Sequence, residues 1–311
     1  DGGLVLQYLK RIDVSFVELE GEDPGVMLMR IQTQHSLHIP FENLSVVMPG
    51  SAELSVELVD VYEKLVVNGR GGYCFEHTVL LYNVLKSLGF LVEIQASRVV
   101  LQPTIPSGFD SKLTHVFLLV VHPEDPTKQQ YLVDVGFGGH GPIEPLKLQW
   151  DQSTISHGTE FVFRKVVINT DVIKKDKHFW NLTSRKFPHD SSEEPLVIYQ
   201  FDIMREVTFD DIRQANFWVC KHPSSIFVNN LFVSGVIKNE DGLERISLWN
   251  LRESRTKLTQ HTKEYRNLQS PTELQNSLAL LSLDVSLSDC KEIYNKVAPL
   301  SEETNPAPIN A

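Results

Sequence analysis

The sequence predicts an α+β protein made of three successive parts. Apolar residues follow a helical period from Tyr8 to about Gly89, and short β-branched and aromatic runs replace it from Val92 to about Tyr199. Both patterns return in the last third of the chain. The order predicts a helical N-terminal domain, a β-barrel or curled antiparallel sheet as second domain, and an α/β C-terminal domain. We place these domains at residues 1–90, 91–205 and 239–311, with an interdomain connector at 206–238.

The clearest helix of the first part runs from Cys74 to Leu88. Its apolar residues recur on one face at the spacing of an amphipathic helix. Gly89 is a natural stop for it. These apolar residues are Phe75, Val79, Tyr82, Leu85 and Leu88.

The second part is predicted from short runs rich in β-branched and aromatic residues. Such runs, bounded by turn residues, are typical of antiparallel strands. We expect strands at Val92–Ile94, Val116–Val121, Tyr131–Val135, Phe161–Ile168 and Leu196–Phe201. The polar stretch Thr170–Lys177 and the segment Pro188–Pro195 are expected to be exposed turns.

The last third mixes both kinds of element. We expect a helical connector near Thr208–Asn216, strands at Ser225–Val233 and Ile246–Leu251, and a helix over Pro271–Leu281. The polar, proline-bearing tail Ser301–Ala311 is expected to be loose on the surface.

Composition limits the partners and the compartment. The net charge of -11, without any Lys or Arg cluster, argues against a nucleic-acid or membrane partner, so a polyanionic ligand would have to be held locally. Three widely spaced cysteines indicate neither a disulfide framework nor a metal site. No stretch is long and apolar enough to span a bilayer, and the start lacks a signal-peptide plan. We therefore expect a cytoplasmic protein.

The stretch Arg70–Cys74 (RGGYC) is the most informative for chemistry. Its two glycines allow a sharp entry that delivers Cys74 to the first turn of the helix. The positive end of the helix dipole and a nearby imidazolium favour a thiolate there. A small buried core residue is the competing interpretation, since free cysteines are often buried.

His115 and Asp134 stand at apolar strands where neither is expected from strand propensity. His115 opens the run HVFLLVV, where a lone histidine is usually a hydrogen-bonded structural residue. Asp134 lies between two valines, and a carboxylate there is costly to bury without a partner. An imidazole N–H from the neighbouring strand would be a suitable one.

Together Cys74, His115 and Asp134 form the set of nucleophile, base and orienting carboxylate. The imidazole must accept the thiol proton, and the carboxylate must fix the tautomer that leaves the accepting nitrogen facing the sulfur. Their spacing fits one helix followed by two adjacent strands.

Two other patterns are poor site candidates. The segment Gly136–Gly141 matches a dinucleotide-binding motif, but Pro142 and Pro145 prevent the helix that would receive a pyrophosphate, so we expect no NAD. Cys74 and His77 have a metal-ligand spacing, but no second pair accompanies them, so we expect no metal. His77 is expected to be a surface or packing residue.

The sequence resembles the arylamine N-acetyltransferases. The resemblance covers roughly the first 150 residues in order, with a looser match at KHPSSIF (residues 221–227). Its motifs are YLKRI (8–12), IPFENL (39–44), RGGYCFE (70–76), Thr114-His115 and DVGFG (134–138).

The resemblance implies the residue roles. Cys74 would carry the acyl group as a thioester, His115 would be its base and Asp134 the orienting acid. Phe41 and Phe137 would be aromatic walls of the acceptor pocket. Arg70 and Glu42 match a structural pair beneath the site, and Ser224 and Ser225 lie in the stretch expected near the cofactor.

The resemblance also implies fold and substrates. The first two domains would share cysteine-protease architecture, and the third would be a lid. Acetyl-CoA, or alternatively propionyl- or malonyl-CoA, would be the donor, and an arylamine, arylhydrazine or arylhydroxylamine the acceptor, as in xenobiotic metabolism. Thr78 departs from the family motif, which usually has Asn there, and this puts local packing or acceptor preference in doubt.

Two competing functions stay open. A cysteine hydrolase would use the same three residues with water as acceptor. A non-catalytic binding module would retain the scaffold without activity. Release of free CoA that depends on an added arylamine would separate acyl transfer from both.

Overall fold

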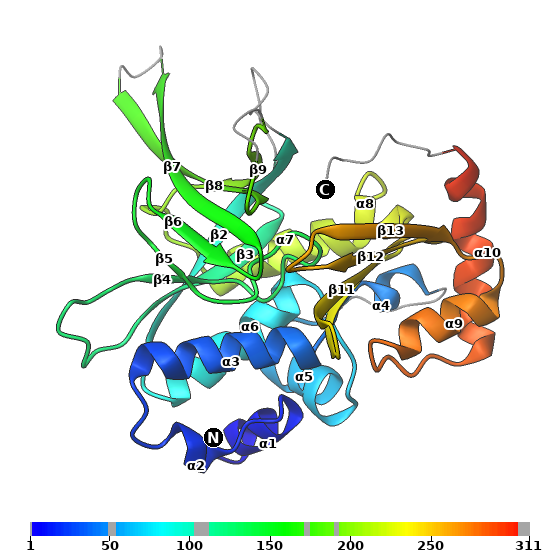
Figure 1. The fold of residues 1–311 in the computed structure, drawn as a ribbon, viewed down its shortest axis with the longest axis horizontal. Helices are drawn as coiled ribbons and strands as arrows, with labels where there is room; N and C mark the ends of the chain where they lie inside the picture. The colour runs from blue at the N-terminus through cyan, green and yellow to red at the C-terminus, as the bar shows by residue number, and fades with distance from the viewer. Residues whose placement is uncertain (1, 49–53, 103–111, 171–174, 190–192, 304–311) are drawn as a thin grey trace.

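A computed structural model describes residues 2–48, 54–102, 112–170, 175–189 and 193–303. Figure 1 shows three neighbouring parts: blue and cyan helices, a green sheet, and a yellow to orange sheet with orange and red helices. The helices of the first part are α1 (Gly2–Arg11), α2 (Phe16–Leu19), α3 (Pro24–His38), α4 (Leu44–Val47), α5 (Leu58–Tyr62), the π-helix η1 (Glu63–Val67) and α6 (Cys74–Ser87).

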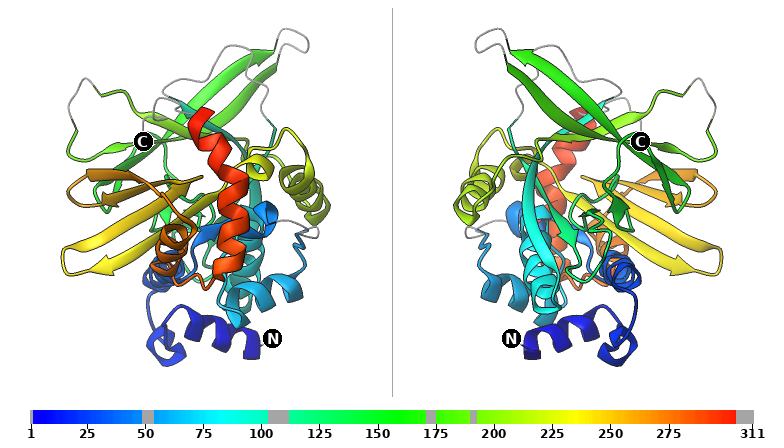
Figure 2. Two further views of the ribbon diagram at one scale, coloured as in Figure 1. Left: turned by 90° about the vertical axis from the view of Figure 1, so that its right-hand side faces the viewer. Right: turned by 90° about the vertical axis from the view of Figure 1, so that its left-hand side faces the viewer.

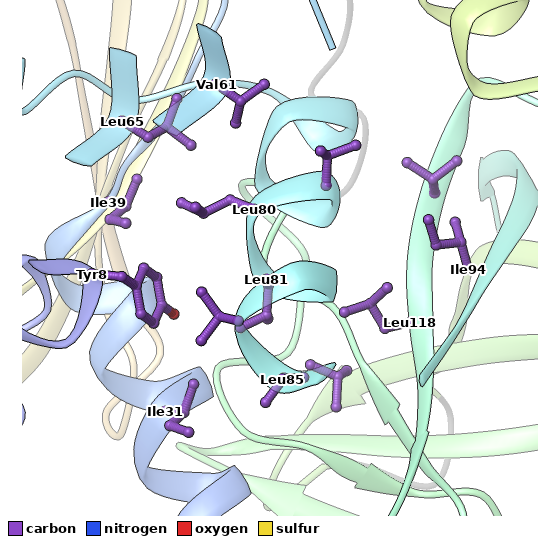
Figure 3. Packing of buried hydrophobic residues seen from close by; sticks show 14 of the residues in the cluster. Tyr8, Ile31, Ile39, Val61, Leu65, Leu80, Leu81, Leu85, Ile94 and Leu118 are labelled. Atoms are coloured by element: carbon purple, nitrogen blue, oxygen red, sulfur yellow. The ribbon is translucent and has the colours of Figure 1, made fainter. Parts of the chain in front are cut away.

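Helix α6 is the central element of the first part. Figure 3 shows Tyr8 and Ile31 on one side of Leu81 in this helix, and Ile94 and Leu118 on the other. All of these side chains belong to one buried cluster. Because apolar residues surround α6 on both sides, its first turn is held firmly between the helical part and the green sheet.

The second part is an eight-stranded antiparallel sheet that nearly closes into a barrel. Its strands follow the order β5-β4-β3-β2-β9-β8-β7-β6, and an isolated bridge joins Trp150, in the segment between β5 and β6, to Phe163 of β7. The strands are β2 (Leu91–Gln102), β3 (His115–Val121), β4 (Tyr131–Val133), β5 (Leu146–Lys147), β6 (Ser153–Ser156), β7 (Thr159–Thr170), β8 (Lys175–Lys186) and β9 (Leu196–Phe201).

The third part contains a five-stranded antiparallel sheet in the order β1-β10-β11-β12-β13. Its first strand comes from the helical part of the sequence, so the sheet ties the two ends of the chain together. Figure 2 shows α10 upright in red beside this sheet. The elements are β1 (Phe41–Glu42), α7 (Phe209–Lys221), α8 (Ile226–Asn229), β10 (Phe232–Asn239), β11 (Gly242–Trp249), β12 (Arg252–Lys257), β13 (Thr262–Asn267), α9 (Pro271–Ala279) and α10 (Leu287–Glu303).

One face of the five-stranded sheet is buried. Val233, Ile246 and Leu248 share a buried cluster with Leu278 of α9 and Ile293 of α10. Side chains alternate between the two faces of a strand. The alternating residues of these strands, such as Ser234 and Ser247, therefore point to the opposite face, toward the barrel.

The predicted fold class is confirmed: helices first, a barrel-like sheet second, and helices with strands last. Some elements differ. Strand β8 was missed: β7 ends at Thr170 and β8 begins at Lys175, so both run into the expected turn Thr170–Lys177, of which residues 171–174 lie outside the described part. Ser225–Val233, expected to be a strand, contains α8 because Ser225 caps a helix there by accepting from the N–H of Phe227.

The domain boundaries stay a proposal, and the sheet suggests one change. All of strand β10 except Asn239 lies inside the expected connector 206–238, yet the strand pairs with β1 and β11. A boundary at residue 239 would divide it from its sheet, so we propose that the third unit begins before Phe232. Of the expected loose tail, Ser301–Glu303 continue α10, and residues 304–311 lie outside the described residues.

Candidate active site

Cys74 is the first residue of α6 and is buried. The glycines before it allow two close approaches. A Cβ at Gly71 would lie 2.2 Å from the carbonyl oxygen of Pro40, and one at Gly72 would lie 2.8 Å from the Glu76 carboxylate. No other residue type fits at either place without displacement. The expected sharp entry to the helix is confirmed.

The predicted thiolate is not supported, because burial raises the pKa of the Cys74 thiol. The carboxylates of Asp134 and Glu76 act in the same direction, whereas backbone N–H groups of Val116 and Phe75 oppose them. The thiol donates to the carbonyl oxygen of Thr114 over 3.7 Å. Desolvation therefore outweighs the helix dipole here, and a base must take the proton when the sulfur reacts.

His115 and Asp134 are in direct contact. His115 begins β3, and Asp134 follows directly after β4, the neighbouring strand. The imidazole Nε2 lies 2.8 Å from Oδ2 of Asp134, and both side chains are buried. The partner that the sequence required for this carboxylate is this imidazole.

Two further donors satisfy Asp134. The N–H of Gly136 donates to Oδ1 over 3.0 Å, and the hydroxyl of Tyr199 donates to Oδ2 over 3.1 Å. An ionised carboxylate only accepts hydrogen bonds, so Nε2 of His115 must be its donor. In a neutral imidazole the other nitrogen, Nδ1, is then the free acceptor. Sequence reasoning missed Tyr199, which lies on β9.

Cys74, His115, Phe41 and Phe137 line one cleft of about 1440 Å³. Phe137 packs its edge on the His115 ring, with centroids 4.9 Å apart. Gly136 passes so close to helix α6 that a Cβ would lie 2.7 Å from Cα of Cys74. The two expected aromatic walls and two of the three expected catalytic residues thus face the same space.

The expected pair beneath the site is present. Arg70 Nη2 lies 2.9 Å from the buried carboxylate of Glu42, whose second oxygen accepts from the N–H of Leu44. Lys64 lies 3.7 Å from Glu42 and 2.7 Å from Glu76. These contacts join β1, beside Phe41, to the segment that enters α6.

His77 is a packing residue inside the molecule. Its Nδ1 lies 2.7 Å from Nε2 of His35, and its Nε2 lies 3.0 Å from the carbonyl oxygen of Gly72. Tyr8 lies 2.9 Å from Nδ1 of His35. Across the residues that the structure describes, no group of three or more His, Cys, Asp or Glu could hold a metal ion.

The remaining residues singled out in the sequence make hydrogen bonds within the protein. Thr78 donates to the carbonyl of Val116 over 3.1 Å, which joins α6 to β3. Ser225 is buried and donates to the carbonyl of Val219, whereas the Ser224 N–H donates to Nδ1 of His222. Residues 136–141 form a loop that lines the cleft, without a following helix. In the described ranges, no helix is long and apolar enough to cross a membrane.

Comparisons with known proteins show to which family the chain is similar. A family model described as N-acetyltransferase matches residues 26–286. An arylamine N-acetyltransferase of Escherichia coli is 33% identical over 66% of this chain, and the chain spans 64% of that relative's length.

Solved structures share the fold. An arylamine N-acetyltransferase from Salmonella typhimurium superposes with a TM-score of 0.76 at 26% identity, over 94% of this chain and 98% of the other. That of Mycobacterium marinum in complex with CoA gives 0.77 at 24% identity, over 94% and 99%. The chain belongs to the arylamine N-acetyltransferase family.

Proposed function

We propose that this chain transfers an acyl group from acyl-CoA to an arylamine through a thioester on Cys74. The observation that carries the proposal is the buried His115–Asp134 pair: its imidazole lines one cleft with Cys74, and the contact with Asp134 leaves Nδ1 of His115 as proton acceptor. The raised pKa of the thiol makes such a base necessary.

In the first half-reaction, the acyl group moves from CoA to the sulfur of Cys74. Nδ1 of His115 takes the thiol proton as the sulfur of Cys74 attacks the thioester carbonyl of acyl-CoA. The bond from that carbonyl to the CoA sulfur breaks, and the CoA thiolate leaves with the proton from the imidazolium. Asp134 stabilises the imidazolium while it exists.

In the second half-reaction, the acyl group moves from Cys74 to the amine. The amine nitrogen attacks the acyl carbon on Cys74, and its proton passes to Nδ1 of His115. The bond to the Cys74 sulfur then breaks, and the imidazolium returns the proton to the sulfur. Donor and acceptor thus react in turn at one cleft, which is a ping-pong mechanism.

The charge of the cleft supports CoA as donor. The whole chain carries a net charge of -11, but the cleft is lined by six Lys and Arg residues against two Glu residues. A locally cationic wall attracts and holds a polyanion such as the phosphates of CoA. The cations are Arg185, Lys186, Arg245, Arg252, Lys263 and Arg266, and the acids are Glu193 and Glu194.

The aromatic walls support an arylamine acceptor and a small acyl group. Phe41 and Phe137 offer apolar ring faces and edges, against which an aromatic amine packs favourably. Acetyl-CoA is the proposed donor, with propionyl- and malonyl-CoA as alternatives to be compared. A cytoplasmic location, the lack of nucleic-acid and membrane partners, and CoA contacts at Ser224 and Ser225 stay predictions.

Intact-mass analysis tests the thioester. After incubation with acetyl-CoA alone, we expect one acetyl group on Cys74 and none on Cys220 or Cys290, because Cys74 is the cysteine that shares the cleft with His115. Cys74→Ala should take up no acetyl group, whereas Cys290→Ala should match the unmodified chain.

Adding an arylamine separates the competing functions. Acyl transfer requires that acetyl leaves Cys74 when arylamine is added, with one acetylarylamine formed per acetyl lost. Amine-independent release of acetate and CoA would instead identify a cysteine hydrolase. Acetylation that persists in Cys74→Ala would contradict the proposal.

A further inference from the structure

The first residues of strand β3 are bonded to helix α6 on the edge where a neighbouring strand would otherwise lie. Strand β4 pairs with β3 over Leu118–Val120, so it does not reach the start of β3 at His115. Buried backbone groups need hydrogen-bond partners. Helix α6 supplies them here through two side chains one turn apart, those of Cys74 and Thr78.

Both backbone groups of Val116 are bonded to α6. The hydroxyl of Thr78 donates to the carbonyl oxygen of Val116 over 3.1 Å, and both residues are buried. Burial raises the pKa of the Cys74 thiol, and the N–H of Val116, which donates to the sulfur, acts against it. The carbonyl and the N–H belong to one residue, so the Thr78 bond also fixes the donor that reaches the sulfur.

The same bond holds the backbone of His115 in place. On its other side, the carbonyl oxygen of Thr114 accepts from the thiol of Cys74 over 3.7 Å, while the imidazole is held at Nε2 by Asp134. Once the thiol has lost its proton, it no longer donates to Thr114. The bond from Thr78 does not depend on the state of the sulfur, so it persists while the sulfur reacts.

We infer that Thr78 is a positioning residue, which keeps the N–H of Val116 directed at the reacting sulfur and the imidazole of His115 beside it. The inference rests on the proposed function, in which that sulfur is the nucleophile. A hydrogen bond to an anion is stronger than one to a neutral group, so the N–H contributes most when the sulfur is a thiolate. Thr replaces only part of an amide's hydrogen-bonding capacity, but it keeps the donor that this contact needs.

Substitutions that remove or keep the hydroxyl test the inference. Thr78→Val has nearly the same shape without the donor, Thr78→Ser keeps the hydroxyl, and Thr78→Asn offers an amide donor. The control is Thr183→Val, because the buried hydroxyl of Thr183 donates to the carbonyl of Val162 over 2.9 Å. Thr183 lies on β8, three strands from β3 in the order of the sheet. The control therefore removes the same kind of bond away from the sulfur and measures the loss of stability alone.

Two measurements separate positioning from stability. Alkylation of Cys74 by iodoacetamide, followed by peptide mapping at a series of pH values, reports how readily the sulfur loses its proton. In Thr78→Val we expect this profile to shift to higher pH by about one unit, which corresponds to a tenfold change in equilibrium. The kcat of Cys74 acetylation by acetyl-CoA should fall about tenfold and the KM should stay unchanged, as for a contact made mainly to the reacting state.

The other variants complete the test. Thr78→Ser and Thr78→Asn should recover most of the profile and of the kcat. Thr183→Val should match the unmodified chain in both, although its Tm is lower. If Thr78→Val does not fold, Thr78→Ala removes the same hydroxyl without placing a methyl group at the carbonyl, and the same expectations apply.

Three results would overturn the inference: an unchanged profile and kcat without the hydroxyl, a loss that Thr78→Ser does not recover, or an equal loss in Thr183→Val. The alkylation needs no acyl-CoA, so it tests Thr78 independently of acyl transfer. If the expected shift is found but acetyl-CoA leaves no acetyl group on the unmodified chain, the proposed function fails while the role of Thr78 toward the sulfur stands.

Discussion

Asp134 shows how single residues fix the chemistry of the site. Its buried carboxylate accepts from His115, Tyr199 and the N–H of Gly136. Three donors offset much of the cost of burying the charge. They also fix the orientation of the carboxylate, and through it the tautomer of His115.

Replacing Asp134 by Asn should leave the fold intact and remove most of the activity. The amide has nearly the same shape, but it can hold the wrong imidazole tautomer and does not stabilise an imidazolium. By analogy with serine triads, the loss in the rate of Cys74 acetylation should be on the order of 10⁴-fold. Single-turnover intact-mass kinetics measures this rate.

Tyr199→Phe is the matched control for that variant. It removes one donor to Asp134 and keeps the His115 contact, so acetylation should fall far less than in Asp134→Asn. Near-normal turnover in a folded Asp134→Asn would mean that Asp134 is only a structural carboxylate.

The sequence predicted the residues whose presence was locally unfavourable. His115 and Asp134 stood out because a histidine and a carboxylate are unfavourable in a buried apolar strand unless they have a hydrogen-bond partner. Cys74 stood out because two glycines precede it at the start of a helix. Tyr199 carried no such signal, since tyrosine is common in strands and fits the alternation of β9. Its contact with Asp134 depends on the pairing of β2 with β9, which lies far away in the sequence.

At the scale of elements, a buried chain of hydrogen bonds joins α1, α3 and α6. The carbonyl oxygens of Gly72 and Pro40 only accept, so Nε2 of His77 donates to them. Its Nδ1 then accepts from His35, which in turn accepts from Tyr8. Each imidazole must be neutral for this arrangement to hold. The carbonyls of Gly72 and Pro40 lie beside the bridge between Phe41 and Gly72, at the entrance to α6.

Acid should therefore weaken the protein through His77. Burial, with a smaller contribution from Lys64, lowers the pKa of His77 to about 4, while the carbonyls of Gly72 and Pro40 oppose this. The unfolded chain takes up a proton near pH 6.5. Between about pH 6.5 and pH 4 the unfolded state thus binds more protons, and the free energy of unfolding falls by roughly 3 kcal/mol.

His77→Gln tests this, because Gln keeps one donor and one acceptor but does not titrate. Urea unfolding at a series of pH values should show a smaller loss of stability in this variant over the same window. His38→Gln, on α3 but outside the chain of bonds, should behave like the unmodified protein. An identical pH dependence in His77→Gln would exclude the proposed coupling.

Elements were predicted where periodicity was strong. Helix α6 was placed almost to the residue, since its apolar face repeats over four turns. Strand β8 was missed because its first half is rich in charge, and its pairing with β7, rather than its own composition, makes it a strand. Strand β10 was divided by the expected boundary because its partner β1 is only two residues long and lies about 190 residues earlier.

At the scale of the whole molecule, the third part contributes to the site without supplying a residue to the predicted triad. Arg245 on β11 donates to the carbonyl of Gly139, and over 3.0 Å to that of Gly141. The loop it holds carries Phe137 against His115 and Gly136 against Cys74. The sheet therefore fixes one wall of the cleft, and the role of the third part as a lid stays a prediction.

Releasing that wall should change the fate of the acyl group more than its formation. Arg245→Gln removes the charged donors that hold residues 139–141, and water can then reach the thioester on Cys74 more readily. A hydrogen bond to a charged group contributes about 1.5–3 kcal/mol, and about 1.4 kcal/mol corresponds to tenfold in rate. We expect hydrolysis to rise roughly tenfold relative to transfer, measured as CoA release without and with arylamine.

Glu244→Gln is the control. Glu244 is the neighbouring residue on the opposite face of the sheet, so this variant should leave the ratio of hydrolysis to transfer unchanged. An unchanged ratio in folded Arg245→Gln would mean that the first two parts exclude water by themselves, and the lid interpretation of the third part would then be wrong.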